Sequence, residues 1–294
     1  EGCDEYCTFC IVPYTRGREV SRPLGEVLEE VRSLAAEGVK EVELLGQTIN
    51  AYRCPESGAD LARLLEEVAA VEGLLRVRFI TSHPRHFGPE LIRVLAHHPN
   101  IFRYLHLPIQ SGSNTILKKM HRKYSREEYL ELVAKIREAA PEINLSTDII
   151  VGFPGETDAD FDDTIDLLET VRFGQVFAFG FSPRPKTPAA RYSPTIADEV
   201  VSERLQRLFA LTGAISRELN EALIGSTVDV LIDGNSRLDD DHWQGRGEDN
   251  RVVNFPKLGR EDVGDVVTVH VERAGAHSLV GRIIGGATRL PVFQ

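Results

Sequence analysis

The stretch Glu1-Gly2-Cys3-Asp4-Glu5-Tyr6-Cys7-Thr8-Phe9-Cys10 holds three of the four cysteines in this 294-residue chain. Thiolates this close in sequence can converge on a single metal centre. A structural zinc site uses four protein ligands, and iron–sulfur clusters take their thiolates from short cysteine-rich loops, normally four for a complete cubane. Three thiolates therefore favour a 4Fe–4S cluster with one iron left open to a ligand that is not protein.

Two other interpretations of the cysteine loop stay open. The loop is also compatible with a zinc knuckle, although no His or Cys lies between Cys10 and Cys54. Cys54 is the one candidate for a fourth ligand, and a free thiol in a loop is the simpler interpretation of that residue. The role of Cys54 is left undecided by the sequence.

The composition is that of a soluble globular protein, with 27% charged and 42% hydrophobic residues. No apolar run approaches the length of a membrane span, and four cysteines are too few for a disulfide scaffold, so we expect a cytoplasmic protein without a membrane partner. The net charge of −11 argues against binding nucleic acid by bulk attraction. Because the chain begins with Glu and its densest motif starts at residue 3, we expect a fragment of a longer protein.

Short apolar runs alternate with amphipathic stretches after the cysteine loop. Strands are predicted at residues 42–45, 77–80, 104–107, 146–151 and 175–181, and helices at 24–37, 61–72, 89–97, 114–120, 126–140 and 157–171. This order predicts right-handed βαβ units and a parallel sheet, either open or closed into a barrel. Each strand ends in a loop rich in Gly, Ser, Gln or Pro, and the carboxyl ends of such strands hold the active site.

The last quarter of the chain has a different texture. A long helix is predicted at residues 196–222, and from Gly225 onward short β-branched runs stand between turns, at 228–232, 252–255, 266–272 and 279–284. This pattern predicts a small all-β barrel or sandwich. We therefore expect two domains, residues 1–223 and 224–294.

The spacing Cys3-x3-Cys7-x2-Cys10, with aromatic Phe9 before the last cysteine, resembles the signature of the radical S-adenosylmethionine enzymes. The surrounding motifs resemble the methylthiotransferase family, and within it the branch that acts on tRNA; they are Thr15-Arg16-Gly17, Leu45-Gly46-Gln47, the stretches 107–113 and 146–157, Asn50-Ala51-Tyr52, Ser182-Pro183-Arg184-Pro185 and the stretch 250–256. The resemblance covers nearly the whole chain.

For the fold, the resemblance implies an α/β partial (β/α)6 TIM-like barrel followed by a small all-β TRAM-like barrel that binds RNA. The family's first strand lies just before the cysteine motif, so we expect it to be missing here. Family members also carry an amino-terminal domain with three more cysteines and a second 4Fe–4S cluster, which we expect to be absent from this chain.

For the function, the resemblance implies that Cys3, Cys7 and Cys10 hold three irons and that S-adenosyl-L-methionine binds the fourth. Its reductive cleavage gives a radical that abstracts hydrogen from carbon 2 of N(6)-isopentenyl-adenosine at position 37 of tRNA, where a methylthio group is installed. The expected partners are tRNA and an electron donor such as a flavodoxin or ferredoxin, and we expect a monomer. We expect this chain alone to fall short of full turnover. The alternatives are a methylthiotransferase for a ribosomal-protein aspartate and, in a different class, a non-catalytic metal-containing RNA-binding protein.

Several residues are candidates for cofactor binding. Phe9 is placed to pack beside the cofactor's adenine, although a lone Phe is usually core. Gly46 and Gln47, at a predicted strand end, suit the methionine moiety, since Gly lets the backbone approach and Gln can accept from an ammonium group. Gln110 and Ser111 follow another strand and are expected to line the cofactor or substrate pocket.

Asp148 lies inside a predicted strand, where a carboxylate facing the core is costly unless it is paired. A hydrogen bond to the cofactor's ribose or to a nearby Arg would explain it, and an outward-facing, solvated Asp is the alternative. Lys186 stands where the family usually has Gly, which the sequence alone does not explain.

The predicted RNA face lies in the second domain, even though that domain carries more acidic than basic residues. The residues proposed for phosphate contacts are Arg246, Arg251, Lys257 and Arg260, with Trp243 or Phe255 for base stacking. A generic solvated surface is the alternative. The densest basic run of the chain, Lys118–Lys123, is a second positive patch or an exposed helix end.

Overall fold

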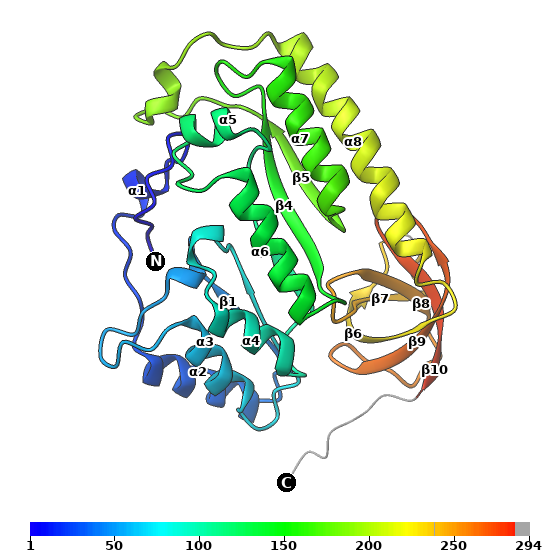
Figure 1. The fold of residues 1–294 in the computed structure, drawn as a ribbon. Coiled ribbons are helices and arrows are strands. Elements are labelled where there is room, and N and C mark those ends of the chain that lie inside the picture. The colour runs from blue at the N-terminus through cyan, green and yellow to red at the C-terminus, as the bar shows by residue number, and fades with distance from the viewer. Residues whose placement is uncertain (238, 286–294) are drawn as a thin grey trace.

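The computed structural model describes residues 1–237 and 239–285 (Figure 1). An α/β part leads through one long helix into a small β-barrel at the other end of the molecule. The predicted end of the second domain at residue 294 lies outside the described residues. Among the described residues, none of the helices combines the length and the apolar character that a membrane span requires.

The five strands predicted after the cysteine loop are all present, each within two residues of its predicted ends. They are β1 (Glu41–Leu45), β2 (Arg76–Ile80), β3 (Tyr104–His106), β4 (Asn144–Val151) and β5 (Gln175–Gly180). The helix before β1 is α2 (Leu24–Ala36), and the helices between the strands are α3 (Leu61–Ala69), α4 (Pro89–His97), α5 (Asn114–Lys119), α6 (Arg126–Ala139) and α7 (Asp158–Val171). Short helical turns that the sequence did not predict are α1 (Val12–Thr15), η1 (Ile49–Ala51), η2 (Pro84–His86) and η3 (Pro188–Arg191).

The strands are parallel and follow chain order, but they do not form one continuous sheet. β1 pairs with β2, and β3 pairs with β4, which pairs with β5. A single parallel bridge between Val77 and Ile101 links the two sheets. In the described part of the chain β1 has β2 as its only strand partner, so its other edge is unpaired. The result is the partial barrel that was predicted.

Alternation along the strands separates an apolar face from a polar face, as the pleat of a strand requires. Val42, Val77, Leu105, Ile149 and Ala178 point toward the helices and belong to one large apolar core. Their neighbours in sequence point into the barrel, and most are polar or partly exposed; they are Glu43, Arg78, His106, Asp148 and Phe177. The barrel interior is thus a polar chamber, and the core lies outside it, under the helices.

The second domain follows the long helix α8 (Asp198–Glu221). Its strands are β6 (Thr227–Asn235), β7 (His242–Arg246), β8 (Val252–Pro256), β9 (Val266–Ala274) and β10 (Leu279–Gly285), closed in the order β10-β8-β7-β6-β9. β7 was not predicted, because its sequence His242-Trp-Gln-Gly-Arg246 lacks the β-branched run that marks the other four. The barrel's own core is nearly all aliphatic and includes Val230, Val253 and Val269.

The small barrel packs against the amino ends of the parallel strands. Four residues at or next to these ends donate hydrogen bonds to its backbone carbonyls: Lys40 to Gly264, Arg76 to Asp229 and Arg246, the backbone N–H of Arg103 to Glu248, and Asn144 to Asp249. The barrel therefore lies at the opposite end of the strands from the loops that were predicted to carry the site (Figure 1).

Candidate cluster and cofactor site

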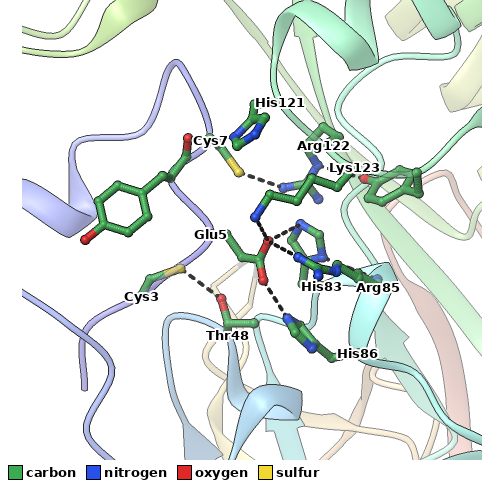
Figure 2. A network of polar contacts seen from close by, with 12 residues as sticks. Cys3, Glu5, Cys7, Thr48, His83, Arg85, His86, His121, Arg122 and Lys123 are labelled. Carbon is green, nitrogen blue, oxygen red and sulfur yellow. Dashed lines mark hydrogen bonds and ion pairs between the residues drawn. The ribbon is translucent and has the colours of Figure 1, made fainter.

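The cysteine loop lies over the carboxyl ends of the parallel strands. Cys3 and Cys7 are buried and Cys10 is half-buried. The Sγ of Cys3 lies 3.2 Å from the Oγ1 of Thr48, in the loop after β1, and Thr8 donates its backbone N–H to the carbonyl of Met120 after α5. Figure 2 shows Cys3 and Cys7 on the same segment, facing loops that follow β1, β2 and α5. The structure thus brings the three predicted ligands to the predicted rim.

The three thiols influence one another electrostatically. Burial raises the pKa of the Cys10 thiol, and the neighbouring Cys7 and Cys3 raise it further. A thiolate is the form that binds metal, and a metal ion offsets such mutual repulsion. The donor set of three neighbouring cysteines therefore fits a three-cysteine cluster, with Cys3, Cys7 and Cys10 as its ligands.

Cys54 has surroundings of its own. Its sulfur accepts a 3.4 Å hydrogen bond from the backbone N–H of Leu24, at the start of α2. A hydrogen bond from Ser57 is the main reason that the pKa of Cys54 is lowered to about 7. The partners of Cys54 are thus different from those of Cys3 and Cys7, which favours the interpretation as a free thiol over that as a fourth ligand.

Glu5, between the first two cysteines, ties the loop to two neighbouring turns. Its Oε1 lies 2.6 Å from the Nε2 of His86, and its Oε2 lies 3.4 Å from the Nζ of Lys123 and 3.7 Å from Arg85 (Figure 2). The hydrogen bond from His86 is the largest cause that lowers the pKa of Glu5 to about 2, against the opposing effect of burial. Glu5 is therefore an ionised anchor of the cysteine loop.

Sequence reasoning did not identify Glu5 or its partners. Oxygen and nitrogen atoms of Glu5, His83 and His86 lie within 4.8 Å of one another, a spacing that also occurs in metal sites. Two cationic groups, Arg85 and Lys123, pair with the same carboxylate, so an ion-pair network explains the grouping. The signal available in the sequence was the pair of carboxylates, Asp4 and Glu5, inside a cysteine motif.

Gln47 lies at the predicted strand end and presents an unsatisfied acceptor. Its Oε1 is buried and has no hydrogen-bond partner among the described residues. A buried polar atom without a partner is costly and indicates a missing donor. At Gly46 a Cβ would lie 3.1 Å from the Cα of Ile49, so a side chain there would crowd the turn. The unpaired acceptor of Gln47 fits a site for the ammonium group of a methionine moiety, whereas the close contact with Ile49 explains the glycine at position 46.

Gln110 and Ser111 form the turn after β3. Gln110 has a φ of +80°, which is rare outside glycine, and its backbone pairs with β4 through Asp148 and Ile150 at 2.9 Å each. The hydroxyl of Ser111 accepts the N–H of Ser113 and lies 3.5 Å from the hydroxyl of Thr164. These contacts give Ser111 a role inside the turn, while a direct contact with the cofactor stays a prediction for both residues.

Asp148 points into the barrel interior and is paired, as the cost of burial requires. Its partner is the Nε2 of His106 at 3.4 Å, rather than an Arg. The Nδ1 of His106 lies 2.8 Å from the hydroxyl of Ser146. Asp148 and His106 line a polar cavity of about 520 Å³ that also contacts Arg246 and Asn250 of the small barrel. A ribose contact for Asp148 stays a prediction.

Phe9 is half-buried against a small apolar cluster that contains Ile116, Met120 and Phe153. This packing supports the interpretation of Phe9 as a core residue, and its contact with adenine stays a prediction. Lys186 is exposed and has a φ of +72°. Glycine adopts that conformation without strain, which explains the family's preference for Gly at this position.

Two of the four predicted RNA-binding residues have partners within the protein. Arg246 forms an ion pair with Asp233 at 3.4 Å and donates to Asn250, and Arg251 is held by Asn220 at 2.7 Å and by Asp249. Arg246 is thus engaged within the small barrel and Arg251 with α8, while an RNA contact of either residue stays a prediction. Phe255 is fully buried, so its predicted stacking on a base is wrong.

The remaining candidates of the RNA face are accessible. Lys257 lies 4.7 Å from the centre of the Trp243 ring and donates to the carbonyl of Asp240. Arg260 is exposed. An RNA contact of Lys257 and Arg260 stays a prediction. The basic run Lys118–Lys123 is different, since its last three residues face the cysteine loop (Figure 2).

Comparison with known proteins agrees with this geometry. Residues 1–168 match the model of the radical SAM superfamily, and residues 221–284 match the TRAM domain. The chain is 48% identical over 291 residues to the tRNA-2-methylthio-N(6)-dimethylallyladenosine synthase of Alkalilimnicola ehrlichii, and 48% identical over 287 residues to that of Moorella thermoacetica. Each alignment covers 97% of this chain and 64% of the relative, so the chain spans about two thirds of the length of these proteins.

A solved structure supports the fold. The crystal structure of Streptococcus suis SuiB bound to S-adenosylmethionine superposes with a TM-score of 0.50 at 13% identity, over 71% of this chain and 45% of that one. The match to the superfamily model covers more than half of the chain and includes all three clustered cysteines. The chain belongs to the radical SAM superfamily.

Proposed function

We propose that the protein containing this chain is a tRNA methylthiotransferase, which installs a methylthio group on carbon 2 of N(6)-isopentenyl-adenosine at position 37. The identity of 48% to synthases named for this product, extending over 97% of the chain, carries the proposal. The cysteine loop and the matched TRAM domain support it, since they supply a radical centre and an RNA-binding module in one chain.

The residues of this chain would divide the work in the following way. Cys3, Cys7 and Cys10 would hold a 4Fe–4S cluster. When bound, the cluster and S-adenosyl-L-methionine supply one-electron chemistry that generates a carbon radical. Gln47 would orient the methionine moiety by accepting from its ammonium group, and Glu5 would fix the cysteine loop to the rim. The polar chamber beneath would receive the base.

Further parts of the proposal concern partners and context. We propose tRNA as the macromolecular substrate, a flavodoxin or ferredoxin as electron donor, a monomeric state and a cytoplasmic location, where tRNA is modified. We assign residues 1–223 to the catalytic domain and 224–294 to the RNA-binding barrel. A second 4Fe–4S cluster would be held elsewhere in the protein, so residues 1–294 alone are expected to support at most reductive cleavage of S-adenosyl-L-methionine.

Mass analysis of tRNA nucleosides tests the proposal. Deleting the gene should remove 2-methylthio-N(6)-isopentenyl-adenosine and leave N(6)-isopentenyl-adenosine in its place. The intact gene should restore the product, whereas a gene carrying Cys7→Ala should not. An unchanged level of the methylthio nucleoside in the deletion strain would contradict the proposal, and loss of methylthio-aspartate from a ribosomal protein would then favour the alternative substrate.

A further inference from the structure

The segment Lys119–Lys123 runs beside the cysteine loop and contacts four successive residues of it. The contacts are Lys123 with Glu5, His121 with the carbonyl of Tyr6, Arg122 with the sulfur of Cys7, and the carbonyls of Met120 and Lys119 with the N–H and hydroxyl of Thr8. Figure 2 shows the side chains of His121, Arg122 and Lys123 directed toward the loop. This basic segment is therefore part of the surroundings of the cysteine loop.

The backbone on either side of Arg122 is strained. His121 has a φ of +62° and Lys123 a φ of +56°, and neither is glycine. Left-handed conformations of such residues persist where the surroundings impose them, and they gather at functional sites. With this backbone, the side chain of Arg122 points inward, and the side chains of His121 and Lys123 contact the cysteine loop on either side of it.

Arg122 is a buried charge without a carboxylate partner. Its side chain donates 2.8 Å hydrogen bonds to the carbonyl of Pro108 and the hydroxyl of Tyr124, and a 3.4 Å hydrogen bond to the Sγ of Cys7. No ion pair joins Arg122 to an Asp or Glu in residues 1–237 and 239–285. Only 5% of the residue is exposed. A buried cation is costly unless an anion lies nearby.

An arginine guanidinium does not lose its proton in proteins, so Arg122 is charged. Its other two hydrogen-bond partners, the carbonyl of Pro108 and the hydroxyl of Tyr124, are neutral groups that supply no counter-charge. The sulfur of Cys7 is therefore the one group in contact with Arg122 that becomes anionic when it binds metal.

We propose that Arg122 is a positioning residue of the cluster, whose buried guanidinium fixes the Cys7 sulfur and balances the negative charge of the metal centre held there. Reduction adds an electron and makes that centre more negative. A fixed positive charge and a hydrogen bond to a ligand sulfur favour the reduced form, which raises the reduction potential. The inference rests on the three-cysteine site and not on the identity of the substrate.

The test compares Arg122→Gln and Arg122→Lys in the anaerobically reconstituted protein. The matched control is Arg137→Gln, which removes a half-buried guanidinium that donates to the carbonyl of Val171 near the far end of α6. The reduced cluster is quantified by electron paramagnetic resonance during a dithionite titration. At the wild-type midpoint, we expect the ratio of reduced to oxidised cluster in Arg122→Gln to be roughly tenfold lower, equivalent to a shift of about −59 mV for one electron. Arg122→Lys and Arg137→Gln should stay near the wild-type midpoint.

The result that overturns the proposal is an unchanged midpoint in Arg122→Gln, or an equal shift in Arg122→Lys. If Arg122→Gln does not retain a cluster, the proposal is tested by comparing amide hydrogen exchange of the metal-free variant with that of the metal-free wild type. Faster exchange confined to residues 1–10 and 119–124 supports the positioning role. Unchanged exchange there, or faster exchange throughout the strands, contradicts it.

Discussion

The guanidinium of Arg76, on β2, donates a 2.7 Å hydrogen bond to the backbone carbonyl of Asp229 in the small barrel. A second bond of 2.8 Å reaches the carbonyl of Arg246. Arg76 thus joins the amino end of the parallel sheet to the TRAM domain from inside the partial barrel. The carboxyl ends of the strands, where the cysteine loop lies, are left free of this contact.

Replacing Arg76 with Met is expected to weaken the join between the domains. Two carbonyls lose a charged donor in a buried setting, and hydrogen bonds to charged groups contribute about 1.5–3 kcal/mol each. The free energy of unfolding, measured by urea denaturation, should fall by about 3–6 kcal/mol, the sum for the two bonds. Arg93→Met, at an exposed position on α4, is the matched control and should change stability little. Equal stability of the two variants would contradict this account of the interface.

Acidification should destabilise the protein through His83. Burial, with the positive charge of Arg122 next, lowers the pKa of His83 to about 3, against the opposing effect of Glu5. The unfolded chain binds a proton as the pH falls below the ordinary value of 6.5, whereas the folded chain does not bind it until about pH 3. Stability is therefore lost progressively between these two pH values.

His83→Gln should flatten that dependence. The groups around His83 are Glu5, Arg85, His86, Arg122 and Tyr124. Because Glu5 titrates at lower pH, the comparison is made by urea denaturation between about pH 7 and 5. His97→Gln, on the exposed side of α4, should keep the wild-type slope. A wild-type slope in His83→Gln would show that His83 is not the responsible group.

Gln47 is expected to contribute to cofactor affinity. Removing the buried acceptor by Gln47→Ala should weaken the binding of S-adenosyl-L-methionine to the reconstituted protein roughly tenfold, the worth of one hydrogen bond to a charged group. Isothermal titration calorimetry measures the change. Gln206→Ala, at an exposed position of α8, is the control. Binding unaffected by Gln47→Ala would remove Gln47 from the proposed site.

The accessible basic residues of the small barrel are expected to contact phosphates. The double variant Lys257→Ala, Arg260→Ala should weaken tRNA binding and make the slope of log affinity against log salt shallower, by about 0.7–0.9 for each phosphate that the variant no longer neutralises. Filter binding at several salt concentrations measures both quantities. Arg273→Ala, at an exposed position on β9, is the control. If the double variant keeps the wild-type affinity and slope, the RNA face lies elsewhere.

The order of strands and helices was predictable because alternating hydrophobicity is local information. The carboxyl-end loops followed from topology, and the cysteine loop was found at that rim. The same reasoning failed where a residue's role depends on a distant neighbour. Arg246 and Arg251 looked like surface cations, but Arg246 pairs with Asp233 inside the small barrel and Arg251 with Asn220 of α8.

The contacts of the cysteine loop could not be read from the sequence. Glu5 meets His86 across 81 residues, and Cys7 meets Arg122 across 115. The basic run Lys118–Lys123 was recognised as unusual. The side chains of its last residues face the cysteine loop because His121 and Lys123 adopt left-handed backbone conformations, which their residue types do not predict. Strand β7 was missed because a Gly and polar residues interrupt its pattern.

The central claim is that Cys3, Cys7 and Cys10, without Cys54, hold a 4Fe–4S cluster. Metal and sulfide analysis after anaerobic reconstitution of this chain tests it most directly. The account predicts roughly four irons per chain, lost in Cys7→Ala and retained in Cys54→Ala. One bound zinc with no sulfide, or loss of the cluster in Cys54→Ala, would contradict it.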